Sequence, residues 1–202
     1  MNQTTPSFKV APITLEGQFV RLAPLQMEHG SQLWDVMKND AEEIFRWIPY
    51  LMRTAEDAQR FVESVLDEQQ RGASLPFVTV EGRSGKIVGS TRFMNIDAVH
   101  RHVEIGSTWI APPWQRTAVN TEAKYLMLRH AFETWKCMRV EFKTDLMNER
   151  SREAILRLGA KEEGTFRKHM LTWSGRIRDS VYFSIIDTEW PEVKARLEAK
   201  LS

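Results

Sequence analysis

The sequence has little cysteine, no long apolar run near its start and no excess of charge of either sign. Its single cysteine, Cys137, cannot form an internal disulfide or a cysteine-rich zinc site, which favours a reducing compartment such as the cytoplasm. With 28 basic and 27 acidic residues the formal net charge is +1, and this balance argues against bulk electrostatic binding of nucleic acid. Residues 1–17 contain no apolar run long enough for a signal peptide or a membrane span, so no membrane association is expected.

The chain also lacks the two common glycine-rich phosphate signatures. It has no GxxxxGK[S/T] run, which excludes a nucleoside-triphosphate P-loop, and no GxGxxG run after a predicted strand, which leaves a dinucleotide-binding fold unsupported. What it has is the composition of a globular protein, with 42% hydrophobic and 27% charged residues. We therefore expect one domain over residues 13–202, preceded by a loose polar segment over residues 1–12.

Hydrophobic residues follow a two-residue repeat in some segments and a helical repeat in others. Thr54 followed by Glu56 and Asp57 is a helix start, and Gly159 closes a helical segment as a C-terminal cap. The order of the segments predicts an α/β (mixed α+β) domain, in which helices flank a mixed sheet, rather than a barrel or a sandwich. Strands are expected at residues 19–25, 76–80, 86–96, 102–110, 139–146, 163–171 and 179–186, and helices at 27–38, 54–72, 120–135, 148–158 and 188–201.

The most informative stretch is residues 103–120, VEIGSTWIAPPWQRTAVN, which runs directly into the helical segment TEAKYLMLRHAFE. A predicted strand ends, a short proline-bounded loop turns the chain, and a long helix begins. Unpaired amides at a helix N-terminus and the positive end of the helix dipole make a binding site for a polyanion. The stretch therefore predicts a polyanion site that uses neither glycine-rich signature.

Residues 115–120 of this loop, QRTAVN, resemble the acyl-CoA pyrophosphate loop of GNAT acetyltransferases, which usually reads Gln/Arg-x-x-Gly-x-Gly/Ala. Two positions depart from that pattern, because Ala118 replaces the first glycine and Asn120 replaces the second small residue. Alanine still permits close backbone approach when its φ is negative, and asparagine can cap the helix. Both residues are therefore compatible with such a loop.

A second group of motifs carries the resemblance further. FKTD at 142–145, NERS at 148–151 and LGA at 158–160 are similar to the strand–helix unit in which the same superfamily holds the pantetheine arm. Together with WIAPPWQRTAVNTEAK at 109–124, they resemble the branch that contains ribosomal-protein N-terminal acetyltransferases (RimJ/RimL type). The resemblance covers nearly the whole chain, roughly residues 15–191.

This resemblance implies a GNAT fold, in which helices flank a mostly antiparallel, twisted sheet that splays between its fourth and fifth strands. It implies acetyl-CoA as the cosubstrate and no metal. The residues that it assigns to cofactor binding are Trp109, Ile110, Gln115, Arg116, Thr117, Ala118, Val119, Asn120, Thr121, Asn148 and Ser151.

The catalytic step requires a neutral amine, yet α-amines have an ordinary pKa of ~8 and lysine amines of ~10.4. In the resembled superfamily the glutamate of the fourth strand often acts as the base, which points to Glu104. Alternatively, the Glu104 carboxylate only binds a neighbouring loop or arginine. Strand alternation puts Glu104 on one face with His102, Gly106 and Thr108.

The resemblance also assigns the groups that stabilise the developing oxyanion and the leaving thiolate. A backbone N–H near Trp109 and Ile110 is the expected oxyanion donor. The tyrosine that many relatives use as proton donor is replaced here by Ile155, so Ser151 is the remaining hydroxyl near the sulfur. Alternatively, Ser151 is only a first-turn residue of its helix, beside Asn148 as N-cap.

Other reactive side chains are weaker candidates. Cys137 lies between a predicted buried helix and a strand, where packing is its expected role. His100 and His102 lack an obvious third ligand, so no zinc site is expected. A cluster of cations on the last predicted hairpin either attracts an acidic substrate or is simply solvated, and consists of Arg167, Lys168, His169, Arg176 and Arg178.

The function expected from these motifs is direct transfer of an acetyl group from acetyl-CoA to a primary amine. The acceptor would be the α-amine of a protein N-terminus or a small aminoacyl-type amine. The alternative is a CoA-binding sensor or assembly protein with weak catalysis, which the altered loop and the absent tyrosine keep open. The physiological acceptor, the acyl preference and the formation of a homodimer are left open by the sequence.

Overall fold

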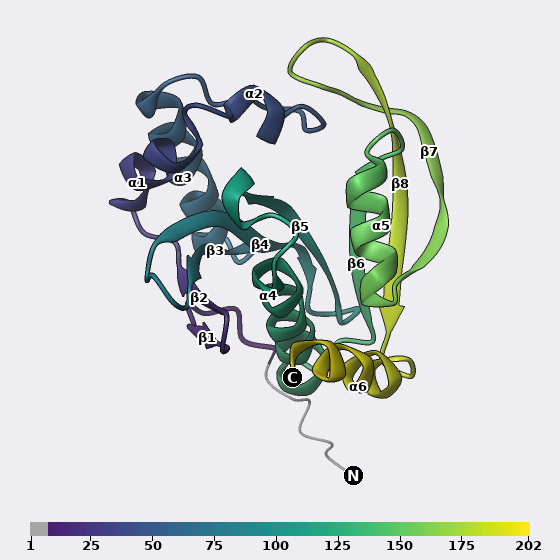
Figure 1. Ribbon diagram of the computed structural model, residues 1–202. Coiled ribbons are helices and arrows are strands. Elements are labelled where there is room, and N and C mark those ends of the chain that lie inside the picture. The colour runs from purple at the N-terminus through teal and green to yellow at the C-terminus, as the bar shows by residue number, and fades with distance from the viewer. Residues whose placement is uncertain (1–7) are drawn as a thin grey trace.

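Eight strands form one sheet with helices on both faces in the computed structural model, which describes residues 8–202 (Figure 1). The strands are β1 (Leu15–Glu16), β2 (Val20–Pro24), β3 (Ser74–Glu81), β4 (Ile87–Asp97), β5 (His102–Ile110), β6 (Arg139–Asp145), β7 (Lys161–Leu171) and β8 (Ile177–Ile186). The helices are α1 (His29–Met37), α2 (Ala41–Ile44), α3 (Ala55–Gln70), α4 (Ala118–Arg129), α5 (Glu149–Leu158) and α6 (Trp190–Leu201). Short helical turns of other types occupy Pro112–Trp114 and His130–Thr134.

The strands lie in the order β1-β2-β3-β4-β5-β6-β8-β7, and only the β5–β6 pair is parallel. This arrangement confirms the predicted α/β architecture with a mostly antiparallel sheet. The long predicted elements lie within a few residues of their observed positions. The prediction missed β1 and α2, because two and four residues are too short to show a periodic pattern.

Two hydrophobic cores lie against the sheet. The larger one joins the apolar sides of α4, α5 and α6 to the sheet and includes Phe93, Phe142 and Phe183. The smaller one lies under α1, α2 and α3 and includes Phe45 and Trp109. Figure 1 shows α1 and α3 near the β2–β4 part of the sheet, α5 near β6 and β8, and α4 between them. Strand β5 contributes side chains to both cores, so it lies at the junction between them.

A buried carboxylate joins α4 to the β1–β2 turn. The two Glu122 oxygens accept the backbone N–H groups of Gln18, Phe19 and Val20 at 2.6–2.8 Å, although Glu122 is only 6% exposed. A Cβ at Gly17 would lie 2.4–2.7 Å from the atoms of this carboxyl group, so the turn needs a glycine for this close approach. Because three backbone donors depend on it, Glu122 fixes where α4 lies on the sheet.

The first described residues pack against the domain. The ring of Phe8 stacks on Trp135 with 4.8 Å between centroids, and Trp135 Nε1 donates to the Lys9 carbonyl oxygen at 3.2 Å. The segment predicted to be loose spans residues 1–12, and residues 1–7 of it lie outside the described residues. Within residues 8–202, no helix combines the length and apolarity that crossing a lipid bilayer requires.

Replacement of Glu122 by alanine should destabilise the domain strongly. The substitution leaves three partly or fully buried N–H donors without an acceptor, which we expect to cost about 3 kcal/mol of unfolding free energy. Urea denaturation measures this loss. The exposed Glu63 on α3 is the matched control, and its alanine variant should change the free energy by about 0.5 kcal/mol or less. Equal effects of the two variants would contradict the anchoring role of Glu122.

Candidate active site

The central feature of the site is the early separation of β5 from β6. Their parallel pairing covers only His102–Glu104 on β5 and Arg139–Glu141 on β6. Beyond these residues β5 continues to Ile110 along β4, whereas β6 continues to Asp145 along β8. The facing edges of β5 and β6 therefore leave their backbone groups available to an elongated ligand.

The last residues of β5 direct one backbone amide into this opening. The Ala111 N–H donates to the Val88 carbonyl oxygen on the β4 side at 2.8 Å. Successive amides of an extended strand point to opposite sides, so the Ile110 N–H points away from β4 and toward the opening. The Ile110 carbonyl oxygen points the same way and accepts Gln115 Nε2 at 2.8 Å. A fixed N–H donor thus lies at the position that the sequence motifs suggested.

The loop after β5 prepares the N-terminus of α4. Asn120 was predicted to cap this helix, and that prediction is wrong, because α4 begins at Ala118 with Thr117 as its N-cap. Thr117 Oγ1 accepts the Val119 N–H at 3.3 Å and donates to the Trp114 carbonyl oxygen at 2.7 Å. The Ala118 and Asn120 amides belong to the first turn, where amides have no intrahelical acceptor and can bind an anion.

Gln115 connects this loop to α5. While its Nε2 donates to Ile110, its Oε1 accepts a hydrogen bond from Arg150 Nη2. At the start of α5 the Asn148 side chain caps the helix by accepting the Ser151 N–H at 3.1 Å. Of the two roles predicted for Asn148, N-cap and cofactor binding, this is the first. Ser151 is half-buried in the first turn, on the β6 side of the opening.

The arrangement fits a long ligand that carries an anionic group. Around the opening lie the Ile110 N–H, the first-turn amides of α4 and the start of α5. Asn120 Oδ1 is buried and has no hydrogen-bond partner within the described residues, so a ligand donor could satisfy it.

Glu104 is buried at the point where β5 and β6 separate, and it is only 3% exposed. Its Oε2 accepts Asn95 Nδ2 at 2.8 Å and lies 3.3 Å from Lys143 Nζ. The other oxygen, Oε1, lies beside Gly106, where an added Cβ would approach it to 3.0 Å. Oε2 is thus bound by neighbouring side chains, as expected if the role of Glu104 is structural. Oε1 faces the space that the absent side chain of Gly106 leaves open.

A bulge in β5 changes which side chains share a face. Between Gly106 and Trp109 the register with β4 shifts by one residue, and Ser107 has a φ of +51°. Thr108 was predicted to share the face of Glu104, and this is wrong, because its hydroxyl contacts Lys124 on α4. Ser107 Oγ instead lies 2.6 Å from the Tyr50 hydroxyl, next to the smaller core.

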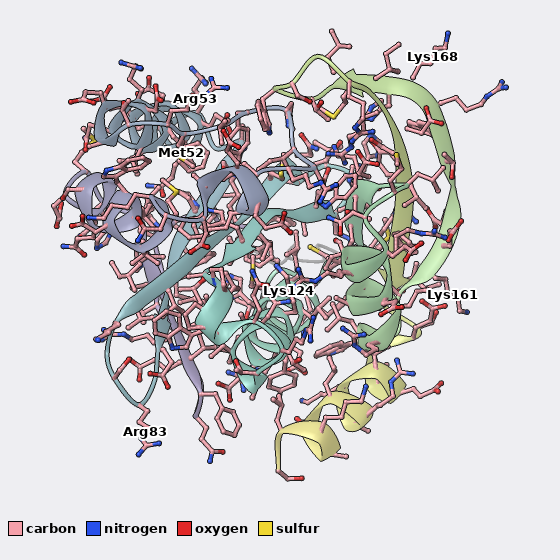
Figure 2. All side chains as sticks on the ribbon, turned by 45° about the horizontal axis from the view of Figure 1, so that its top comes forward. Met52, Arg53, Arg83, Lys124, Lys161 and Lys168 are labelled. Carbon is pink, nitrogen blue, oxygen red and sulfur yellow. The ribbon has the colours of Figure 1, made fainter. Side chains whose placement is uncertain are left out.

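Lys124 is a buried amine that the sequence analysis did not single out. Its Nζ donates to the hydroxyls of Thr91 on β4 and Thr108 on β5, both of which are neutral partners. Figure 2 shows Lys124 near the middle of the molecule, whereas Arg83 and Lys161 lie at its periphery. Burial lowers the pKa of Lys124 to about 7. The available signal was a lysine among apolar residues in the helix predicted to be deeply packed.

The weaker candidates take no part in this arrangement. Cys137 is buried in the larger core, and burial raises the pKa of its thiol to about 12, which fits the packing role that was predicted. The rings of His100 and His102 lie 6.5 Å apart. Within residues 8–202, no group of three or more His, Cys, Asp or Glu side chains is arranged to hold a metal ion.

Comparison with known proteins identifies the family. A family model described as the acetyltransferase (GNAT) domain matches residues 20–161, which is more than half of the chain. The chain belongs to the GNAT acetyltransferase family. This membership confirms the resemblance found in the sequence, and GNAT enzymes use acetyl-CoA as their acetyl donor.

Several GNAT relatives match over most of their length. The structure of a GCN5-related N-acetyltransferase from Brucella melitensis is 32% identical in sequence and has a TM-score of 0.88. The match covers 95% of this chain and 86% of the Brucella chain. A Bacillus subtilis (strain 168) protein with the provisional name ribosomal N-acetyltransferase YdaF is 24% identical over 179 residues, 86% of this chain and 94% of its own. Mycobacterium smegmatis RimJ, solved in complex with CoA-disulfide, is 24% identical with a TM-score of 0.83 and covers 95% of this chain and 96% of its own.

Replacement of Lys124 by methionine should reduce the increase of stability with pH. Lysine in the unfolded chain has a pKa of ~10.4, whereas the folded value is about 7, so the unfolded state binds more protons between these two values. Stability of the wild type should therefore gain on the order of 3 kcal/mol, relative to the methionine variant, as pH rises from 7 to 10.4. Urea denaturation at several pH values measures the difference.

The exposed Lys86 is the control for this experiment, and the stability of its methionine variant should follow that of the wild type across the same pH range. If wild type and Lys124→Met instead kept a constant difference from pH 7 to pH 10, Lys124 would not be neutral in the folded GNAT domain.

Proposed function

We propose that this chain transfers an acetyl group from acetyl-CoA to a primary amine, the α-amine of a protein N-terminus, by direct attack on the thioester. One observation carries the proposal. The buried Glu104 carboxylate lies where β5 and β6 separate, on the same strand as the inward-pointing Ile110 N–H. A base and an oxyanion donor on one rigid strand are the two groups that acyl transfer to an amine requires.

In this proposal acetyl-CoA binds in the opening between β5 and β6, with α5 beside it. The first-turn amides of α4 would receive the pyrophosphate, with Arg116 beside them as an exposed cation. Arg116 has a φ of +61°, a conformation in which a glycine is usual, and it directs the chain into the helix. Asn148 and Ser151 on α5 would border the pantetheine arm from the β6 side.

The proposed role of Glu104 is to take a proton from the acceptor amine through bound water, because Ile110 lies six residues further along β5, roughly 20 Å at about 3.3 Å per residue. Because Oε2 is held by Asn95 and Lys143, we assign this role to Oε1. The amine nitrogen then bonds to the thioester carbon, and the negative charge that develops on the carbonyl oxygen is stabilised by the Ile110 N–H. When the carbon–sulfur bond breaks, the electron pair leaves with the CoA thiolate.

Departure of the thiolate needs little help from the chain. Ile155 replaces the tyrosine that relatives use, and it is buried in the larger core. A thiol has an ordinary pKa of roughly 8.5, so its thiolate can leave at neutral pH with only a hydrogen bond. We assign this hydrogen bond to the hydroxyl of Ser151, which is half-buried in the first turn of α5.

The choice of a protein N-terminus as acceptor rests on the relatives. The Bacillus subtilis relative carries a ribosomal N-acetyltransferase name, and another structural relative is RimJ. The competing function, a CoA-binding sensor with weak catalysis, predicts binding without turnover. An assay of CoA thiol release with acetyl-CoA and a panel of peptides with free N-termini distinguishes the two.

Replacement of Glu104 by glutamine should reduce turnover about a hundredfold, because the variant has no carboxylate to accept the amine proton. The loss should be largest at pH values below the pKa of the acceptor amine, where the amine must be deprotonated. Affinity for acetyl-CoA should be unchanged. Steady-state kinetics across pH and calorimetry of acetyl-CoA binding measure both quantities.

The matched control is Glu141→Gln. Glu141 is the β6 neighbour of Glu104 and pairs with Arg139 at 2.8 Å, so it has a structural partner instead of a catalytic one. Its variant should keep turnover within about threefold of wild type. If Glu104→Gln retained the wild-type rate and pH profile, Glu104 would be structural, and the proposed base would be wrong.

A further inference from the structure

The side chains on one face of β6 and β8 are mostly polar and lie on the same side as Glu104. Lys143 is directly opposite Tyr182, and Asp145 is directly opposite Ser180. Directly paired residues share a face, and so do residues two apart, which places Arg178 on this face as well. Glu104 belongs to it through its pairing with Glu141. The other face of the two strands carries buried apolar residues of the larger core.

Arg178 is a buried cation on this face whose hydrogen bonds go to neutral groups. It is 4% exposed, and its guanidinium donates to Ser180 Oγ and to the Trp47 carbonyl oxygen, both at 2.9 Å. Asp145 lies nearby, but its carboxylate already accepts hydrogen bonds from Arg176 and the Met147 N–H. Glu104, the other nearby carboxylate, is held by Asn95 and Lys143, so Arg178 makes no hydrogen bond to an anion and has spare capacity for one.

His169 on β7 adds a second donor to the same region. Its Nδ1 is buried without a hydrogen-bond partner within the described residues, and its ring lies 5.9 Å from that of Tyr182. Burial lowers the pKa of His169, and the charges of Lys143 and Arg178 lower it further, while the charge of Glu104 raises it. A shallow hollow of about 680 Å³ lies beside it, lined by Phe166, Arg167, Lys168 and His169.

The rim of this face is basic too. Arg46 and Arg176 lie 4.9 and 5.4 Å from the ring centre of Trp47, and Arg53 lies 5.3 Å from that of Trp173. Figure 2 shows Arg53, which precedes α3, and Lys168 on β7 on either side of the upper part of the molecule. Arg46 lies 3.7 Å from Glu43 and Arg176 pairs with Asp145, whereas the side chains of Arg53 and Lys168 form no ion pair within the described residues.

We propose that this face binds a carboxylate of the acetyl acceptor, with Arg178 as the residue that selects it, while the acceptor amine lies between Glu104 and Ile110. The preferred substrate is therefore a peptide whose second residue is Asp or Glu. This inference rests on the proposed acetyl transfer to an amine. It adds that the enzyme selects its acceptor by a negatively charged side chain as well as by the primary amine.

The test compares two peptides that differ only in Glu or Gln at position two. Wild type should acetylate the Glu peptide with at least tenfold higher kcat/KM and bind it at least tenfold more tightly by calorimetry in the presence of CoA. Arg178→Gln should lose this preference while it acetylates the Gln peptide within a few-fold of wild type and keeps its affinity for acetyl-CoA. The exposed Arg83→Gln, in the distant β3–β4 turn, should retain the preference.

Equal kcat/KM and equal affinity of wild type for the two peptides would overturn the inference, and so would a preference that survives in Arg178→Gln. The wild-type comparison decides even if the variant fails to fold. Failure to acetylate any amine would contradict the proposed function instead, and the binding measurements would still decide the inference. Free glutamate and glutamine as acceptors show whether a carboxylate on a small amino acid suffices or a peptide is required.

Discussion

The site depends on one constraint, the limit of three paired residues on each of β5 and β6. Both strands continue beyond this point, and there each is paired along its outer edge only, which leaves the facing edge without a strand partner. Strand β5 stays with β4 and β6 stays with β8, which divides the sheet into two halves. The opening between the halves is lined by backbone of rigid strands, with the buried Glu104 carboxylate where the strands separate and the Ile110 N–H at the far end of β5.

Buried polar groups on α4 fix the half of the sheet that contains β1 to β5. Glu122 joins the helix to the β1–β2 turn, and Lys124 joins it to β4 and to the bulge in β5. On the other side of the bulge the Tyr50 hydroxyl contacts Ser107. The short stretch of β5 next to the proposed oxyanion donor is therefore held from both faces of the sheet. Burial of Lys124 costs stability, which is a common cost of a preorganised site.

Much of the fold could be predicted because the long strands and helices carry clear periodic patterns. The helix that starts after Thr54 was placed correctly because a capping box with Asp57 marks it in the sequence. The N-cap of α4 was misplaced because Thr117 and Asn120 are both good capping residues, and only the loop geometry selects Thr117. The face of Thr108 was predicted wrongly because a serine, and not a glycine, forms the bulge at Ser107.

Tertiary contacts account for the parts of the site that the sequence did not reveal. Glu104, Lys143 and Arg178 are far apart in the sequence, and only the register of β5, β6 and β8 brings them to one face. Lys124 was overlooked because a lysine in a helix is normally exposed, and its burial depends on hydroxyls from two strands. Local pattern predicted the elements, whereas register and bulges determine which side chains meet.

The central claim is that the opening between β5 and β6, together with the N-terminus of α4, is the acetyl-CoA site. NMR of the isotope-labelled chain, with and without acetyl-CoA, tests it through the exchange and chemical shifts of backbone amides. The account predicts slower exchange and large shifts for Ile110, Ala118 and Asn120, with little change at the capped N-terminus of α3 around Asp57. Unchanged amides at Ile110, Ala118 and Asn120 under saturating acetyl-CoA, or changes centred on the start of α3, would contradict it.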